Sequence, residues 1–460
     1  MKKMKRRARL CIALALVLIL GLGYYVVELA RDGGTWAAYP GNGDVYTDGY
    51  LTKGAIYDRN ETLLMENNSS GTPYYNDSYD IRCATLHAVG DSVGNISTGA
   101  NRVFADKMIG YSLVMGTYSI SGNGRHLILT IDANVCATAN AALAGRKGTV
   151  GVYNYQTGEI ICMVSSPNYD PLDPPDLSSE EMNGAFYNKF LSSTFVPGSI
   201  FKVITATAAL ETLSDIDSYE YTCPGVISYG EAETDRITCP YQHGTQSLSD
   251  ALAHSCNCAF ADLTLKVGPS KLEEYTKKAG ITRQYSINGI KTAAGTFDFP
   301  STDVSLAWAG IGQYHDLVNP CAMMVYMGAI ANGGVAVNPT LIKDVRFANG
   351  WDADFTFSPG KDRLVEEDTA AKLDEMLHND VVNQYGEGNF PGLDLCAKSG
   401  TAEVGDGNTP HSWFYGYIRN PGYPYAFVVL VENGGSGAEV AGDVANQVLQ
   451  TLVNMSPMGD

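Results

Sequence analysis

Basic residues are scarce in this sequence: 31 Lys and Arg stand against 50 Asp and Glu, so the formal net charge is −19 at pH 7. Such a surface repels polyanions, which argues against nucleic acid as a partner. Repeats, low-complexity tracts and collagen-like periodicity are absent, which excludes solenoid and fibrous chains. At 460 residues the chain is long enough for two domains and a large core.

Metal-binding patterns are also missing from the sequence. It contains no Cys-x-x-Cys, and we see no metal-ligand cluster, so we predict neither a metal nor a cofactor. Of the ten cysteines, Cys11 lies in an apolar run, which leaves an odd number of nine. Cys223 and Cys239 flank a polar, turn-rich loop and are the best candidates for a disulfide. Two free thiols are an equally good interpretation of that pair.

The sequence has one long apolar run near its start. Residues 10–27 are uncharged, and six of the 31 basic residues precede them within residues 1–9. Eighteen residues in a helix span about 27 Å, close to the hydrocarbon thickness of a bilayer. We therefore predict that residues 1–33 form a single-pass membrane anchor with a cytoplasmic N-terminus and an extracytoplasmic remainder. A cleaved signal peptide is the alternative.

A possible nucleophile lies at the start of a predicted helix. Pro197 and Gly198 precede an alanine-rich run at residues 203–210, so Ser199 and Lys202 should lie in the first turn, on one face. An amine held neutral there can take the proton of a hydroxyl, and the helix N-terminus favours the negative charge that develops in acyl transfer. The structural alternative is an ordinary N-cap serine.

Two further motifs follow in the chain. They are Ser255-Cys256-Asn257, a pattern that also recurs by chance, and Lys398-Ser399-Gly400-Thr401, which occurs once. Singly, the first could cap a helix and the lysine of the second could be a strand-edge charge. In this order, however, the three motifs resemble those of the penicillin-recognising acyltransferases, the penicillin-binding proteins and serine β-lactamases.

The resemblance extends upstream and implies a domain organisation. Residues 53–60, Lys-Gly-Ala-Ile-Tyr-Asp-Arg-Asn, are similar to the segment that opens the membrane-proximal pedestal of class B, monofunctional penicillin-binding proteins. Residues 34–145 are too short for the glycosyltransferase domain of the bifunctional class. We therefore expect a small β-rich pedestal at 34–145 and an α+β transpeptidase domain at 146–460, with an antiparallel sheet flanked by helices.

Local patterns predict several elements of that domain. Two β-rich runs within residues 148–166 are joined by a glycine turn and read as a hairpin. Residues 393–402, 412–418 and 425–432 should form an antiparallel meander, covered by a helix at 440–455. We also expect a helix at 248–253, a loop-rich insert at 212–250, a polar linker at 28–47 and helices broken by turns within 301–333.

The family resemblance also implies the chemistry. The substrates would be peptidoglycan stem peptides ending in D-Ala-D-Ala, and β-lactams would acylate the same serine. Ser199 would attack the penultimate carbonyl, Lys202 would take its proton, and Ser255 would relay a proton to the leaving D-Ala. Asn257 would bind the substrate amide.

The third motif would hold the other end of the substrate. Lys398 and Thr401 would bind the terminal carboxylate, and the strand that also contains Ser399 and Gly400 would pair with the peptide backbone. His254 and His411 lie beside motifs, but the reaction needs no imidazole, so we expect them at most to line the cleft. A polytopic membrane glycosyltransferase is the expected partner.

Other functions remain open at this point. A serine β-lactamase would hydrolyse the acyl-enzyme, and a D,D-carboxypeptidase would release D-Ala without cross-linking. A protein of another class, a silent cell-wall scaffold or β-lactam sensor, would not need its serine. A competing motif, Gly90-Asp91-Ser92-Val93-Gly94, matches a hydrolase nucleophile elbow, but a poor helix start follows it, so we interpret it as a turn.

Overall fold

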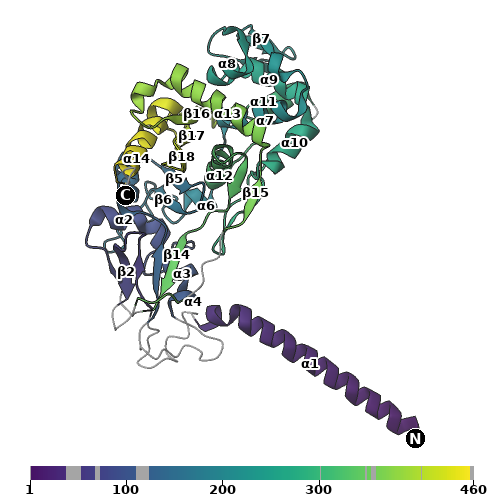
Figure 1. Ribbon diagram of the computed structural model, residues 1–460, viewed down its shortest axis with the longest axis vertical. Coiled ribbons are helices and arrows are strands. Elements are labelled where there is room, and N and C mark those ends of the chain that lie inside the picture. The colour runs from purple at the N-terminus through teal and green to yellow at the C-terminus, as the bar shows by residue number, and fades with distance from the viewer. Residues whose placement is uncertain are drawn as a thin grey trace.

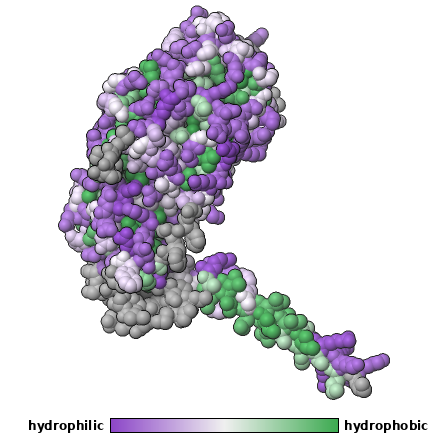
Figure 2. All heavy atoms as spheres, viewed as in Figure 1, coloured by the Kyte–Doolittle hydropathy of each residue, from purple (hydrophilic) through white to green (hydrophobic). Residues whose placement is uncertain are grey.

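A computed structural model describes residues 2–37, 53–67, 73–109, 124–300, 302–347, 350–353, 359–405 and 407–455. Helix α1 (Lys2–Ala37) projects away from the body of the protein (Figure 1). It is long and apolar enough to cross a membrane, and none of its most apolar window is buried. Figure 2 shows its hydrophobic surface ending in a hydrophilic tip.

The sequence predicted a polar linker at residues 28–47, but part of that segment is helical. Helix α1 continues through them to Ala37, because each further residue adds a hydrogen bond to a helix that already exists. Arg31 supports this last part by pairing with Glu28 one turn earlier, at 2.8 Å. The rest of the predicted linker, residues 38–47, lies outside the described residues.

The main sheet has five antiparallel strands in the order β16-β17-β18-β5-β6. Their bounds are β5 Gly148–Asn154, β6 Ile160–Ser166, β16 Leu395–Ala402, β17 His411–Ile418 and β18 Tyr425–Val431. The predicted hairpin and meander are thus confirmed, and the strands are almost wholly buried. Helices pack against this sheet: α5 (Ala133–Leu143), α12 (Pro320–Ala331) and the predicted closing helix α14 (Gly442–Met455).

A mostly helical part lies beside one end of that sheet, at the upper right of Figure 1. Its helices are η3 Gly198–Phe201, α7 Lys202–Thr212, η4 Ile216–Ser218, α8 Leu248–Ala253, α9 Asn257–Val267, α10 Pro269–Lys278 and α11 Asp303–Gly310. The segment predicted as a loop-rich insert also contains four short strands that pair as β7–β10 and β8–β9. They are β7 Glu220–Cys223, β8 Val226–Ser228, β9 Arg236–Thr238 and β10 Gly244–Ser247.

A second five-stranded sheet lies toward α1, in the order β14-β4-β1-β2-β3. Its strands and neighbouring helices are β1 Ile56–Tyr57, β2 Leu63–Asn67, β3 Pro73–Tyr75, β4 His126–Leu129, β14 Ile342–Arg346, α2 Tyr79–Val89, α3 Ala100–Val103 and α4 Ala105–Met108. β14 pairs with β4, so this sheet joins segments from both sides of residue 146. The division into domains at that residue stays a prediction.

The remaining described elements connect these parts. They are α6 Lys189–Ser192, β11 Ser286–Ile287, β12 Ile290–Lys291, β13 Val335–Val337, β15 Lys361–Arg363, α13 Glu367–Asp380, the π-helical turn η6 Val381–Tyr385, the 3₁₀ turns η5 Glu233–Asp235 and η7 Glu387–Asn389, and the π-helical turn η8 Gly437–Ala441.

Two lysine side chains lie in the core, where an ammonium group is unusual. Lys202 and Lys398 are 0% and 1% exposed and rank among the largest fully buried side chains of the described residues. Burying an ammonium group without partners is costly, so each lysine must be satisfied locally or lose its proton. Their surroundings define the candidate site.

Candidate active site

The Ser199 motif forms the turn that starts helix α7. η3 is a 3₁₀ turn that runs directly into α7, so Ser199 and Lys202 lie on one face, as predicted. Lys202 Nζ is 3.1 Å from Ser199 Oγ. Gly198 permits the turn, because its φ of +57° lies in the left-handed region.

Lys202 is held between the first and second motifs. Its Nζ donates to the backbone oxygen of Ser255 and to Asn257 Oδ1, both at 2.6 Å, and lies 3.1 Å from Ser255 Oγ. Burial, assisted by the positive charge of Lys398, lowers the pKa of Lys202 to about 7. A large fraction of this amine is therefore unprotonated at neutral pH and able to accept the proton of Ser199.

The second motif lies in the sharp junction between α8 and α9. Ser255 adopts φ +51°, a conformation that costs energy for a residue with a Cβ, and Cys256 caps the N-terminus of α9. Asn257 bridges two elements: its Oδ1 accepts from Lys202 and its Nδ2 donates to the backbone oxygen of Thr238 at 2.7 Å. The junction thus presents both polar side chains to the lysine.

The third motif lies on β16, the strand at the edge of the main sheet. Lys398 Nζ is 3.4 Å from the Asp380 carboxylate, and both side chains are buried. Burial alone would lower the pKa of Lys398, but Asp380 and Tyr385 outweigh it and raise that pKa, so Lys398 stays protonated. Its charge is close enough to Lys202 to lower the pKa of that amine.

Strands β16 and β17 also fix the position of the Ser199 turn. Trp413 Nε1 donates to the backbone oxygen of Val196 at 3.0 Å, and the Tyr415 hydroxyl donates to that of Ile200 at 2.7 Å. β16 approaches the turn so closely that a Cβ at Gly400 would lie 2.9 Å from Ile200 Cγ2. The structure therefore brings all three motifs together at one end of the sheet.

A family comparison agrees with this arrangement. Residues 148–450, well over half of the chain, match the penicillin-binding protein transpeptidase domain. The chain belongs to this family.

Individual relatives narrow the assignment. The chain is 28% identical to the peptidoglycan D,D-transpeptidase PbpA of Mycolicibacterium smegmatis over 469 aligned positions, covering 95% of each protein. It is 28% identical to PbpA of Mycobacterium tuberculosis over 339 positions, 68% of each. With stage V sporulation protein D of Bacillus subtilis the identity is 27% over 368 positions, 74% of this chain and 54% of that protein.

Solved structures share the fold. The crystal structure of M. tuberculosis penicillin-binding protein A superimposes with a TM-score of 0.75 at 24% identity, covering 87% of this chain and 99% of that one. The D,D-transpeptidase domain from Eggerthella lenta gives 0.75 at 24% identity, covering 89% and 99%. With the relatives, these likenesses identify a class B penicillin-binding protein with an α+β fold, as the sequence had suggested.

Two residues that contact the third motif of this penicillin-binding protein were not predicted from the sequence. Asp380 and Tyr385, at the end of α13 and in η6, carry no motif of their own. The Tyr385 hydroxyl is 2.8 Å from Ser399 N, 2.9 Å from Ser399 Oγ, 3.1 Å from Asp380 Oδ2 and 3.2 Å from Lys398 Nζ. These two residues fix the position of the third motif through their contacts with Lys398 and Ser399, and only the tertiary structure reveals them.

The competing serine lies elsewhere. Ser92 is exposed in a turn that follows helix α2, whereas a nucleophile elbow requires a strand before it. The interpretation of this segment as a turn is confirmed. Of the two histidines beside motifs, His254 pairs with Gln246 at 3.0 Å, and His411 accepts from the backbone of Asn433 at 3.1 Å.

The expectation that the chain lacks a metal-ligand cluster is wrong. Cys223, Cys239, His243 and Cys256 bring their ligand atoms within 4.8 Å of one another. All the cysteines are free, and the Sγ atoms of Cys223 and Cys239 lie 3.8 Å apart, so the structure does not contain the disulfide considered for this pair. The cluster does not form a compact sequence motif, because its members are spread over more than 30 residues and converge only through folding.

Proposed function

We propose that this class B penicillin-binding protein is a peptidoglycan D,D-transpeptidase in which Ser199 is the nucleophile and Lys202 the general base. The observation that carries the proposal is the buried Lys202 amine. It lies 3.1 Å from Ser199 Oγ, and its pKa of about 7 leaves it partly unprotonated at neutral pH. Relatives named peptidoglycan D,D-transpeptidases support the substrate class.

Acylation follows from this geometry. Lys202 accepts the hydroxyl proton while Ser199 Oγ bonds to the carbonyl carbon of the penultimate D-Ala. The C–N bond to the terminal D-Ala then breaks, and Ser255, 3.1 Å from Lys202 Nζ, passes a proton back to the leaving amine. Backbone N–H groups of Ser199 and Thr401 stabilise the oxyanion. The amine of a second stem peptide then displaces Ser199 and forms the cross-link.

The third motif binds the substrate. Lys398, kept positive beside Asp380, attracts the terminal carboxylate together with Thr401, whose side chain is exposed. β16 is an edge strand, so its segment at residues 398–401 pairs with an extended peptide, which joins the sheet as an added strand. Asn257 holds the substrate amide. A β-lactam occupies the same place and acylates Ser199.

Localisation follows from helix α1. An apolar helix of this length fits a single-pass membrane anchor. Because the basic residues lie on its N-terminal side, the N-terminus is cytoplasmic and the catalytic domain extracytoplasmic. A reporter that is active only outside the cytoplasm should therefore work when fused after Met455 and fail when fused before Lys2.

A monofunctional transpeptidase needs glycan strands that another protein makes. We infer that a polytopic membrane glycosyltransferase supplies them and contacts α1, whose apolar surface is open along its length. Photocrosslinkers placed at Leu14 and Leu18 should capture such a protein in cells. Capture of lipid alone from both positions would contradict a partner on this helix.

The test of the main proposal is intact-mass analysis of the full-length protein in detergent after labelling with a fluorescent penicillin. We expect one adduct on Ser199, lost in Ser199→Ala and formed about 10²–10⁴-fold more slowly in Lys202→Gln. Ser92→Ala is the matched control and should label normally. An adduct mapped to Ser92 would overturn the assignment.

The same preparation separates the alternative functions. Stem-peptide dimers are expected from pentapeptide strands, whereas D-Ala release without dimers would indicate a carboxypeptidase. An adduct that turns over within seconds would indicate a β-lactamase. Growth supported by Ser199→Ala as well as by the unaltered protein would indicate a scaffold or sensor.

A further inference from the structure

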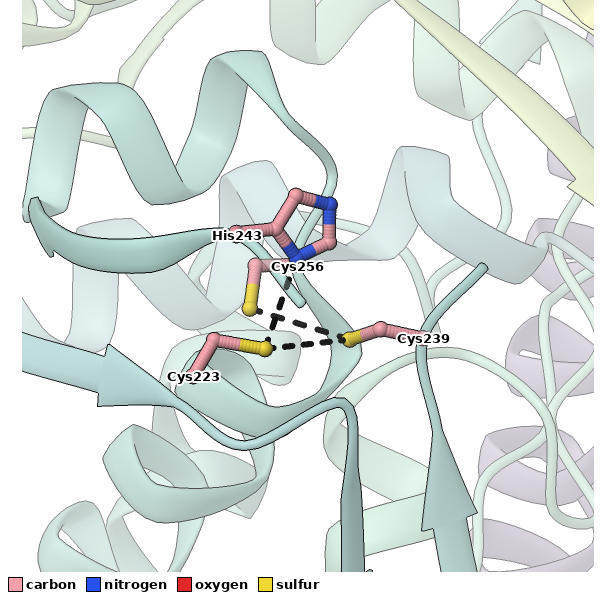
Figure 3. Close-up of side chains that lie close together, drawn as sticks. All are labelled: Cys223, Cys239, His243 and Cys256. Atoms are coloured by element: carbon pink, nitrogen blue, oxygen red, sulfur yellow. Dashed lines mark hydrogen bonds between the residues drawn. The ribbon is translucent and has the colours of Figure 1, made fainter. Parts of the chain in front are cut away.

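Three cysteines and a histidine converge beside the second motif (Figure 3). Cys223 ends β7, Cys239 follows β9, His243 precedes β10, and Cys256 caps α9. In Figure 3 the three sulfurs and the near nitrogen of the imidazole point toward a common centre. The proposed reaction uses none of these four side chains.

The distances match a tetrahedral metal site. Cys239 Sγ lies 3.8 Å from both Cys223 Sγ and Cys256 Sγ, and His243 Nδ1 lies 3.4 Å from Cys223 Sγ. Zinc–sulfur bonds of about 2.3 Å and zinc–nitrogen bonds of about 2.0 Å in a tetrahedron separate two sulfurs by about 3.8 Å, and nitrogen from sulfur by about 3.5 Å. We propose that Cys223, Cys239, His243 and Cys256 bind one zinc ion.

The backbone around the sulfurs is arranged for thiolates. Each of the three sulfurs accepts one backbone N–H at 3.4 Å: Gly225 donates to Cys223, Cys258 to Cys239 and Ala259 to Cys256. Cys256 also lies at the N-terminus of α9, where the helix dipole favours negative charge. Metal-bound thiolates in proteins are stabilised by the same kind of outer contacts.

The histidine is oriented by its neighbours. Its ring stacks on the ring of His254, with centroids 5.4 Å apart, and it also contacts the ring of Tyr241, with centroids 4.4 Å apart. The Nδ1 atom faces the sulfurs, so in the metal-bound tautomer the proton is on Nε2. Nε2 is buried without a hydrogen-bond partner among the described residues, so stacking, not a second hydrogen bond, positions this ring.

The donor set selects the ion. Three thiolates and one imidazole form a soft Cys₃His set, which suits zinc and not the oxygen-seeking magnesium or calcium. With four protein ligands the coordination is complete, which is typical of a structural zinc. A disulfide would use two sulfurs and leave the approach of Cys256 and His243 unexplained.

The site would stiffen the second motif, an effect that rests on the proposed function. Cys256 lies between Ser255 and Asn257, so a bond from its sulfur to zinc ties the strained junction to β7 and β9. Asn257 makes a parallel connection through the backbone of Thr238, next to Cys239. These four residues are positioning residues for the motif that holds Lys202.

The test measures zinc in the full-length protein, purified in detergent under argon with a reductant and without chelators. Elemental analysis should give about one zinc per chain. Cys239→Ser and His243→Ala should raise the dissociation constant for zinc more than the ~10–100-fold typical of outer-shell changes. Cys258→Ser is the matched control: its sulfur lies 3.6 Å from Cys239 Sγ but outside the cluster of four, so it should retain the metal.

Cobalt provides a second readout. Replacement by Co²⁺ should produce the intense visible bands of a tetrahedral thiolate site, absent in Cys239→Ser. Metal-free protein with a Cys223–Cys239 disulfide by peptide mass, or full zinc retention by Cys239→Ser, would overturn the site. Zinc removal should slow penicillin labelling about 10-fold; stoichiometric zinc in a protein that penicillin never labels would refute the proposed function and leave the metal site standing.

Discussion

The two buried lysines differ because their partners differ. Lys202 Nζ contacts a backbone carbonyl, an amide oxygen and two hydroxyls, neutral groups that do not offset the cost of burying its charge. Lys398 faces the Asp380 carboxylate, which keeps it protonated. One lysine is therefore suited to accept a proton, and the other to attract a carboxylate.

This difference predicts a pH dependence. Below the pKa of about 7, Lys202 is protonated and cannot accept the Ser199 proton, so the rate of penicillin acylation should rise with pH and level off above it. Lys398→Ala removes a positive charge that lowers this pKa, so the midpoint should move to higher pH. Stopped-flow labelling across pH measures it, with the exposed Lys372→Ala as control. An unshifted midpoint in Lys398→Ala would contradict the electrostatic coupling.

Tyr385 offers a second test at the residue scale. Tyr385→Phe removes the hydroxyl that contacts Ser399, Lys398 and Asp380, so we expect a loss of about 1–3 kcal/mol of stability and slower acylation. Tyr417→Phe is the matched control, because the Tyr417 hydroxyl of β17 donates to Asp374 of α13 at 2.8 Å. It should lose similar stability and acylate normally. Equal acylation by both variants would mean that Tyr385 is merely structural.

At the scale of elements, the decisive contact is between strand β16 and the turn η3. β16 is bonded to β17 along one side only, and the Ser199 turn packs against it. Glycine at position 400 permits this close approach, because a Cβ there would lie 2.9 Å from Ile200 Cγ2 and 3.2 Å from the backbone oxygen of Pro197. The edge of the sheet and the turn that starts α7 are therefore in direct contact.

Gly400→Val should separate β16 from the Ser199 turn. The added side chain must push the turn away from β16, which costs about 1–3 kcal/mol and moves Ser199 relative to Lys398. We expect a lower melting temperature and slower penicillin labelling. Gly388→Val, at an exposed position with open space around it, is the control and should change neither. Normal labelling of Gly400→Val would show that this approach is not needed.

At the scale of the whole molecule, the catalytic body and helix α1 make few contacts with each other. α1 extends outward and buries only Gly33 among its described residues, with a small contact to α4 near its end (Figure 1). The second sheet is tied to the body by β14, a strand from late in the chain. We therefore expect the body to fold without α1.

Deletion of residues 1–30 tests this independence. The shortened chain keeps the end of α1 near α4, so it should be soluble without detergent, with an unchanged melting temperature and unchanged penicillin labelling. Calorimetry and labelling of both forms measure this. Aggregation, or a melting temperature lowered by more than a few degrees, would show that the anchor supports the fold.

The sequence alone was enough for features whose determinants lie close together in the chain. Glycine and proline placed the Ser199 turn, and two β-rich runs with a glycine turn placed the hairpin. Alternating residues placed the meander, and three short motifs identified the family, because each of these signals depends on neighbouring residues. Tertiary structure decided the rest. Asp380 and Tyr385 meet Lys398, three dispersed side chains meet Cys256, and β14 joins a distant sheet, since such contacts depend on the path of the whole chain.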